Sequence, residues 1–145
     1  MKLLVTAFLT LLFAVPSWAV LGEHEQSVNA DQQRMHGERR SIPQQGYTMH
    51  EISAPDGMVV KEYVAASGIV FGVSWRGPTL PDLKNLLGTY FPEFQQSAGS
   101  GPRHRALAVR TDRLVVQSSG HMRDFRGRAY VTSLIPPQVT EEAVQ

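Results

Sequence analysis

The sequence predicts an α+β fold, in which a mostly antiparallel β-sheet of about five or six strands has one main helix packed on one face. Two adjacent patterns carry this prediction. Residues 69–76 alternate between two sets of side chains and are rich in β-branched and aromatic residues, as in a half-buried strand. Residues 80–94 have apolar side chains at helical spacing, which form one stripe. A small β-barrel-like domain with an appended helix is the alternative architecture.

The strand that begins at Ile69 and the helix that follows it are expected to supply most of the core. One face of the strand is predicted to carry Ile69, Phe71, Val73 and Trp75. The apolar stripe of the helix consists of Leu80, Leu83, Leu86, Leu87, Tyr90, Phe91 and Phe94. We therefore expect this stripe to pack on the face that carries Phe71 and Trp75.

Local signals mark the start of this helix and an interruption in it. Thr79, with Asp82 three residues later, resembles a capping box, and Pro81 is tolerated in a first turn. Pro92 lacks an amide hydrogen and clashes with the preceding turn. We expect the helix to kink or restart at Phe91–Pro92.

The remaining strands are predicted from turn sequences. Residues 47–54 and 58–65 flank Pro55-Asp56-Gly57, and Ser67-Gly68 leads into the strand that begins at Ile69, which predicts an antiparallel meander. Residues 106–109 and 114–117 are predicted to form a second hairpin, and 129–135 is the last apolar segment.

Residues 1–19 are predicted to be a signal peptide. Lys2 precedes an apolar run, and small residues at its end predict cleavage after Ala19. The run is too short to span a bilayer core of about 30 Å, and no later transmembrane helix is predicted. Residues 20–46 are predicted to be a polar N-terminal arm with a short helix from Ser27, and residues 47–145 a single α+β domain. The protein is expected to be soluble in the periplasm or secreted, and without Cys it has no disulfide.

Charge is distributed unevenly along the chain. Loss of Lys2 with the signal peptide reduces the 14 basic side chains to 13, which equals the number of acidic ones. Residues 101–130 contain seven Arg and only Asp112 and Asp124 as acids, so this segment carries a net charge of +5. An arginine-rich third beside an acidic remainder favours binding to an anionic partner or to another protein.

We predict a binding site around the densest part of the arginine-rich segment. Arg123, Arg126 and Arg128 can contact carboxylate or phosphate groups bidentately, and Phe125 lies among them. An envelope protein, an anionic glycan or a lipid headgroup fits an exported protein, whereas nucleic acid is not expected. The alternative is a solvated face whose arginines pair with Asp124, Glu51 or Glu62.

An enzymatic function is the second hypothesis. His121, with Asp124 and Ser119 nearby, is a weak candidate for the centre of a small hydrolase. These residues are neighbours in sequence, whereas the members of hydrolase triads are brought together from distant positions. The five His lack the spacing of metal ligands, and there is no phosphate-binding loop, so no metal or cofactor is predicted.

Two segments resemble one family of exported bacterial proteins, the domain-of-unknown-function family 2844. They are residues 70–91, VFGVSWRGPTLPDLKNLLGTYF, and residues 119–129, SGHMRDFRGRA, and Ser27-Val28 with Asp31 also fits the family pattern. The resemblance extends over the whole mature chain. It implies an exported bacterial domain, assigns no catalytic residue and leaves the function open.

Overall fold

The computed structural model describes residues 20–99 and 106–145, which form one seven-stranded antiparallel sheet in the order β1-β2-β3-β4-β7-β6-β5. The strands are β1 (Glu38–Gln44), β2 (Tyr47–Ser53), β3 (Val59–Ala65), β4 (Val70–Gly77), β5 (Ala106–Arg110), β6 (Leu114–His121) and β7 (Asp124–Val131). The helices are α1 (Gln26–Met35), α2 (Leu83–Leu87), η1 (Gly88–Tyr90), α3 (Phe91–Ala98), η2 (Thr132–Leu134) and η3 (Glu141–Ala143). The predicted α+β class and antiparallel sheet are confirmed.

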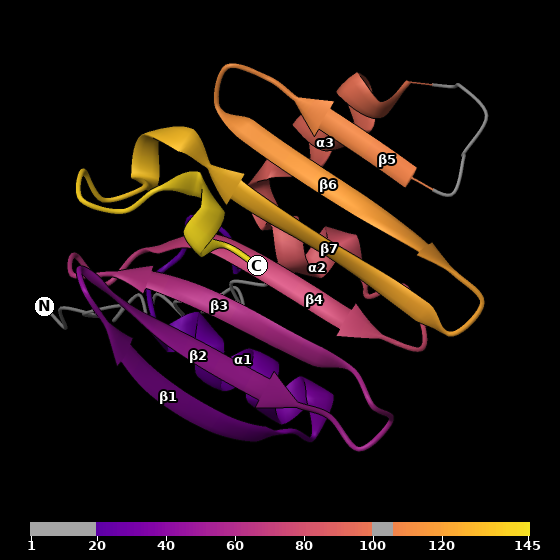
Figure 1. Ribbon diagram of the computed structural model, residues 1–145, viewed down its shortest axis with the longest axis horizontal. Coiled ribbons are helices and arrows are strands. Elements are labelled where there is room, and N and C mark those ends of the chain that lie inside the picture. The colour runs from indigo at the N-terminus through magenta and orange to yellow at the C-terminus, as the bar shows by residue number, and fades with distance from the viewer. Residues whose placement is uncertain (1–19, 100–105) are drawn as a thin grey trace, which may run out of the picture.

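Helices α1, α2 and α3 lie on one face of this sheet, and the C-terminal segment, residues 132–145, lies on the other (Figure 1). We call the face that carries α1, α2 and α3 the helix face and the other the tail face. The chain crosses the helix face from β4 to the far edge at β5, then returns through β6 and β7, which pairs with β4. The predicted meander is confirmed for β2, β3 and β4. The β-barrel alternative is wrong, because β1 and β5 lie at opposite edges of an open sheet.

The sheet has seven strands rather than five or six, because polar sequences form two stretches of strand that alternation did not reveal. The predicted arm at 20–46 contributes β1, whose side chains are mostly exposed because it is an edge strand. Pro43 is compatible with that edge. The polar run 124–128 forms the first half of β7. The same N-terminal segment places Val20, Leu21 and Val28 in the core.

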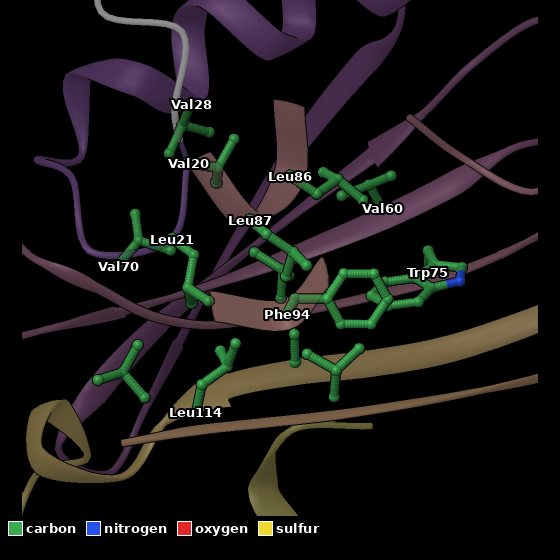
Figure 2. Packing of buried hydrophobic residues seen from close by; sticks show 14 of the residues in the cluster. Val20, Leu21, Val28, Val60, Val70, Trp75, Leu86, Leu87, Phe94 and Leu114 are labelled. Atoms are coloured by element: carbon green, nitrogen blue, oxygen red, sulfur yellow. The ribbon is translucent and has the colours of Figure 1, made fainter. Parts of the chain in front are cut away.

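The largest apolar cluster lies between the sheet and the helices on the helix face. In Figure 2, Leu87 points into the middle of this cluster, with Leu21 and Phe94 around it. Leu87 and Leu21 are fully buried, and Trp75 and Phe94 are nearly so. The predicted packing of the helix stripe against Trp75 is therefore confirmed for Leu86, Leu87 and Phe94, which all belong to this cluster.

The predicted long helix is two short helices joined by a 3-10 turn. Pro92 lies in the first turn of α3, so the predicted restart at Phe91–Pro92 is confirmed. The start differs from the prediction, because Asp82 is the N-cap residue of α2 and its carboxylate accepts a hydrogen bond from the Asn85 amide at 3.2 Å. Leu80 lies before the helix and is half exposed, so it does not belong to the buried stripe.

Phe71 lies on the tail face, contrary to the prediction. Tyr63 pairs with Gly72 and Val64 with Val70, so Phe71 is an extra residue in β4. Such a bulge shifts the alternation of side chains by one position. Val73 and Trp75 consequently remain on the helix face, whereas Phe71 packs with Tyr63 in a second cluster.

The second cluster covers only part of the tail face. It comprises Tyr63, Phe71, Val115, Tyr130 and Val144, with the rings of Tyr47 and Phe71 in an edge-to-face contact at 5.8 Å. Residues 132–145 lie over it, as the yellow segment in Figure 1 shows. A side chain at Gly72 would meet the Val144 side chain at 2.7 Å, so glycine allows this segment to pack closely. The rest of the tail face, toward the β6–β7 turn, is polar.

Candidate arginine face

The polar part of the tail face is formed by three neighbouring strands, β4, β7 and β6. Strand alternation puts Asp124, Arg126 and Arg128 on the same side as Tyr130, which belongs to the tail-face cluster. Two rows cross the strands in register, Arg76–Arg126–Ser119 and Ser74–Arg128–Gln117. We call the side chains of Arg76, Gln117, Ser119, Arg126 and Arg128 the arginine face.

Two arginines of this face share a single carboxylate. Arg76 and Arg126 are directly opposite each other on β4 and β7. Asp124 Oδ2 accepts a hydrogen bond from Arg126 Nη2 at 2.6 Å, and its Oδ1 lies 3.7 Å from Arg76 Nε. The hydrogen bond from Arg126 holds the pKa of Asp124 below its usual range, so this carboxylate stays ionised. One anion between two cations leaves a positive charge uncompensated.

The third arginine of the face is bound by neutral groups. Arg128 Nε donates to Gln117 Oε1 at 2.8 Å, and Nη1 donates to the Val144 carbonyl at 3.1 Å. Its guanidinium lies 5.7 Å from the centre of the Tyr130 ring. These contacts hold the guanidinium in place without neutralising its charge. Glu141 and Glu142 lie near the charge of Arg128, so the uncompensated positive charge of the arginine face lies at Arg76 and Arg126.

Residues 17–144 match the family described as "Protein of unknown function (DUF2844)". The chain belongs to this family. No curated protein and no solved structure matches it. Membership in DUF2844 confirms the resemblance carried by the motifs, and both the strand–helix unit and the arginine face lie within the matched residues.

The structure brings together part of the binding site that the sequence predicts for this chain. Arg126 and Arg128 are neighbours on the arginine face, whereas Arg123 lies at the β6–β7 turn with a left-handed φ of 64°. Phe125 points to the helix face, because it alternates with Arg126 along β7, so it does not lie among the arginine side chains. Arg103 and Arg105 lie outside the described residues.

Arg76 is the member of the site that the sequence analysis missed. The alternation of side chains along this strand already indicated that Arg76 lies on the opposite face from Trp75. Only the pairing of β4 with β7 brings it to Arg126, 50 residues away. Of the three acids proposed as alternative partners, Asp124 contacts the arginines, Glu62 lies buried on the helix face, and Glu51 lies opposite Lys61.

The predicted hydrolase residues do not form a hydrogen-bonded chain. His121 and Asp124 are opposite each other across the β6–β7 turn, and Ser119 is opposite Arg126. The carboxylate of Asp124 is held by Arg126 and Arg76 instead of by an imidazole. His121 is exposed at the end of a hairpin. This arrangement lacks the oriented base that a serine nucleophile needs.

A different histidine makes the contacts that His121 lacks. His50, on β2, lies between Ser41 of β1 and Glu25 at the start of α1, with hydrogen-bond distances of 2.8 and 2.9 Å. No local pattern indicated this group, because β1 was not predicted and its pairing with β2 creates the contact. Ser41 and His50 therefore became candidates only through the structure.

Residues 20–99 and 106–145 contain no group of three or more His, Cys, Asp or Glu side chains that could hold a metal ion. The helices in this described part of the chain are all too short or too polar to span a lipid bilayer. The predicted signal peptide, residues 1–19, lies outside the described residues.

Proposed function

We propose that this protein is an exported bacterial binding module whose arginine face holds an anionic group of its partner. The observation that carries the proposal is the pair of Arg76 and Arg126, which face each other in register and share one carboxylate. Like charges directly opposite on a sheet are destabilising. Asp124 offsets only part of this repulsion, and a second anion bound by the pair would relieve the rest, so the pair favours ligands with carboxylate, phosphate or sulfate groups.

The position of the face on the molecule supports binding to a large partner. Arg76 and Arg126 lie on the part of the sheet that residues 132–145 leave uncovered, toward the β6–β7 turn in Figure 1, whereas Arg128 lies at the border and contacts Val144. Arg76 and Arg126 are more than half exposed, so their donors are accessible. An acidic envelope protein, an anionic glycan or a lipid surface presents several anionic groups at once and can contact all three arginines.

Export is part of the proposal and has a separate test. Its motivation is the basic, apolar and small-residue pattern of residues 1–19. Burial of Val20 and Leu21 is compatible with cleavage after Ala19, since the folded domain includes the residues directly after that position. The intact mass of the protein from its source cell should equal that of a chain that begins at Val20. Retention of the initiator Met on the folded protein would contradict export.

The binding proposal is tested with residues 20–145, dextran sulfate and phosphatidylglycerol vesicles, at about 50 and 300 mM salt. The parent should bind at least one of these probes, and more weakly at high salt, because exposed charges are screened over about 10 Å at 0.1 M. Arg76, Arg126 and Arg128 changed together to Gln should reduce low-salt affinity at least about tenfold, as expected for loss of charge-assisted contacts.

A matched variant separates this site from a general effect of charge. Arg39, Lys84 and Arg113 lie on or beside the helix face, where Arg39 contacts Asn29 of α1 and Arg113 contacts Glu93 of α3. Their change to Gln lowers the net charge by the same three units. The control should retain parental affinity within about twofold, because it leaves the arginine face intact. Equal losses in the two variants, or no binding to either probe, would contradict the proposal.

A further inference from the structure

The hydrogen-bonded group of Ser41, His50 and Glu25 lies on the helix side of the sheet, away from the arginine face. Ser41 Oγ lies 2.8 Å from His50 Nδ1, and His50 Nε2 lies 2.9 Å from Glu25 Oε1. The three residues come from β1, β2 and the turn before α1. A hydroxyl in contact with an imidazole that a carboxylate orients is the arrangement of an activated serine nucleophile.

The contacts define the role of each atom. Glu25 accepts a hydrogen bond from His50 Nε2–H, so the neutral imidazole has its lone pair on Nδ1. Nδ1 then accepts the proton of the Ser41 hydroxyl. His50 is only 3% exposed, and packing holds its ring, whereas Ser41 is exposed at the edge of the sheet. The base is fixed in place and the nucleophile is accessible.

The geometry of the β1–β2 hairpin leaves the Ser41 backbone amide without a strand partner. Gln44 and Tyr47 flank a two-residue turn and form the first hydrogen-bonded pair. Pairs alternate along an antiparallel ladder, so Ser41 and His50 form a non-hydrogen-bonded pair, in which side chains approach most closely. The Ser41 N–H consequently points away from β2, at the free edge of the sheet.

A buried carboxyl group lies beside His50 on the next strand. Glu62 is opposite His50 across β2 and β3, is fully buried, and has no hydrogen-bond partner among the described residues for either carboxyl oxygen. The titratable groups around His50 are Glu25 before α1, Asp31 and Arg34 on α1, Arg39 on β1 and Glu62 on β3. Burial raises the pKa of Glu62 to about 8, so at neutral pH this carboxyl group carries no charge and Glu25 is the carboxylate that contacts the ring.

We propose that Ser41 is the nucleophile of an ester-hydrolysing site, with His50 as its general base and Glu25 as a positioning residue. Nδ1 of His50 takes the hydroxyl proton as Ser41 Oγ bonds to the ester carbonyl carbon. The Ser41 N–H donates to the oxyanion, the carbon–alkoxy bond breaks, and His50 gives its proton to the departing alcohol. Water, deprotonated by His50, then releases the carboxylic acid and restores the Ser41 hydroxyl. The open edge of the sheet suits an ester on an extended or macromolecular substrate, and this activity is independent of binding at the arginine face.

The test combines covalent labelling with ester hydrolysis, on residues 20–145 of the chain. A fluorophosphonate, which phosphorylates activated serines, should modify the peptide that contains Ser41, as located by mass spectrometry. With 4-nitrophenyl butyrate, Ser41→Ala should lose both the label and at least about 100-fold in kcat/KM, as for loss of a nucleophile that a general base activates. Ser53→Ala, another exposed serine on the same hairpin, should keep parental labelling and turnover.

Glu25→Gln distinguishes catalysis from a structural contact. Gln keeps a hydrogen-bond acceptor for His50 but removes the charge, so kcat should fall about tenfold or more with KM nearly unchanged. A fluorophosphonate label absent from Ser41 would overturn the proposal. Equal ester hydrolysis by the parent and Ser41→Ala would also overturn it, as would a Glu25→Gln change that lowers only the urea midpoint. Ser41 is exposed, so the alanine variant is expected to fold.

Discussion

The two faces of the sheet are built from the same strands but are buried to different extents. On the helix face, α1, α2 and α3 cover an apolar cluster that draws on β2, β3, β4, β5, β6 and β7. On the tail face, residues 132–145 cover a smaller aromatic cluster, and the strands beyond it present arginines and polar side chains. The buried surfaces account for folding, since burial of apolar area is the main favourable contribution. The open part of the tail face makes no such contribution.

This difference locates the surface on which function is expected. Surface arginines contribute little to stability, typically about 0–1 kcal/mol per exposed pair. Arg76 and Arg126 lie directly opposite each other, where a pair of opposite charge would stabilise the sheet more than two arginines do. Mutations on the helix face should therefore affect unfolding, and mutations on the arginine face should affect binding.

Glu62 should produce the largest effect, as a pH dependence of stability. Burial raises its pKa to about 8, and Arg34 and Arg39 offset part of that rise. Between about pH 4.5 and 8 the unfolded chain loses this proton while the folded chain keeps it. Stability then falls as pH rises, by about 1.4 kcal/mol per pH unit, or roughly 4 kcal/mol from pH 5 to 8.

The measurement is urea unfolding of the parent and Glu62→Gln between pH 5 and 9. Glutamine stays neutral, so the variant should lose the decline and be more stable than the parent at pH 8 and above. Asp124, Glu93 and Glu141 have lowered pKa values, which make stability increase as pH rises, but mainly below about pH 4.5. Parallel pH profiles for the two proteins would show that Glu62 is ionised in the folded state.

Leu87→Ala should cost about 2–5 kcal/mol of the free energy of unfolding, since it removes buried methyl groups from the centre of the helix-face cluster. Lys84 lies on the same short helix but is exposed, so Lys84→Ala should change stability by less than about 0.5 kcal/mol. Thermal or urea unfolding provides the measurement. Similar midpoints for both variants would mean that α2 does not pack on the sheet.

Gly72→Ala tests the covered part of the tail face and should cost about 1–3 kcal/mol. The added methyl group would overlap the Val144 side chain, which is fully buried. The strain should fall on residues 132–145, so their amide hydrogens should exchange faster while those of the helix-face core change little. Uniformly faster exchange throughout the sheet would contradict this division between the two faces.

Asp124→Asn should change stability least, by less than about 1 kcal/mol, because its ion pairs with Arg126 and Arg76 are exposed. It should nevertheless increase affinity for dextran sulfate, since both arginines lose their competing carboxylate. The affinity and the urea midpoint are measured on the same preparation. A reduced affinity would show that Asp124 positions the arginines for the ligand instead of competing with it.

Local patterns were sufficient to predict much of the core. The Pro55-Asp56-Gly57 turn and strong alternation predicted the meander, and the spacing of Leu86, Leu87 and Phe94 predicted the helical stripe. Local patterns failed where strands lack an apolar face. β1 is an exposed edge strand without such a face. The bulge at Phe71 moves this side chain to the other face of the sheet, and the alternation of residue types does not reveal that shift.

Both candidate sites depend on pairings between distant segments. Arg126 and Arg128 share a face because they are two residues apart in a strand, but Arg76 joins them only through the β4–β7 pairing. Ser41 meets His50 through the register of a hairpin whose first strand was not predicted. Strand order and register follow from long-range packing, which single-sequence periodicity does not encode.

Amide chemical shifts can show whether the uncovered part of the tail face is the binding surface. The ¹⁵N-labelled protein, residues 20–145, is titrated with dextran sulfate at low salt. The largest changes should fall on residues 74–76, 117–121 and 124–128, and they should be absent from α1 and α2. Changes centred on the helix face, or spread over all basic residues alike, would contradict the claim.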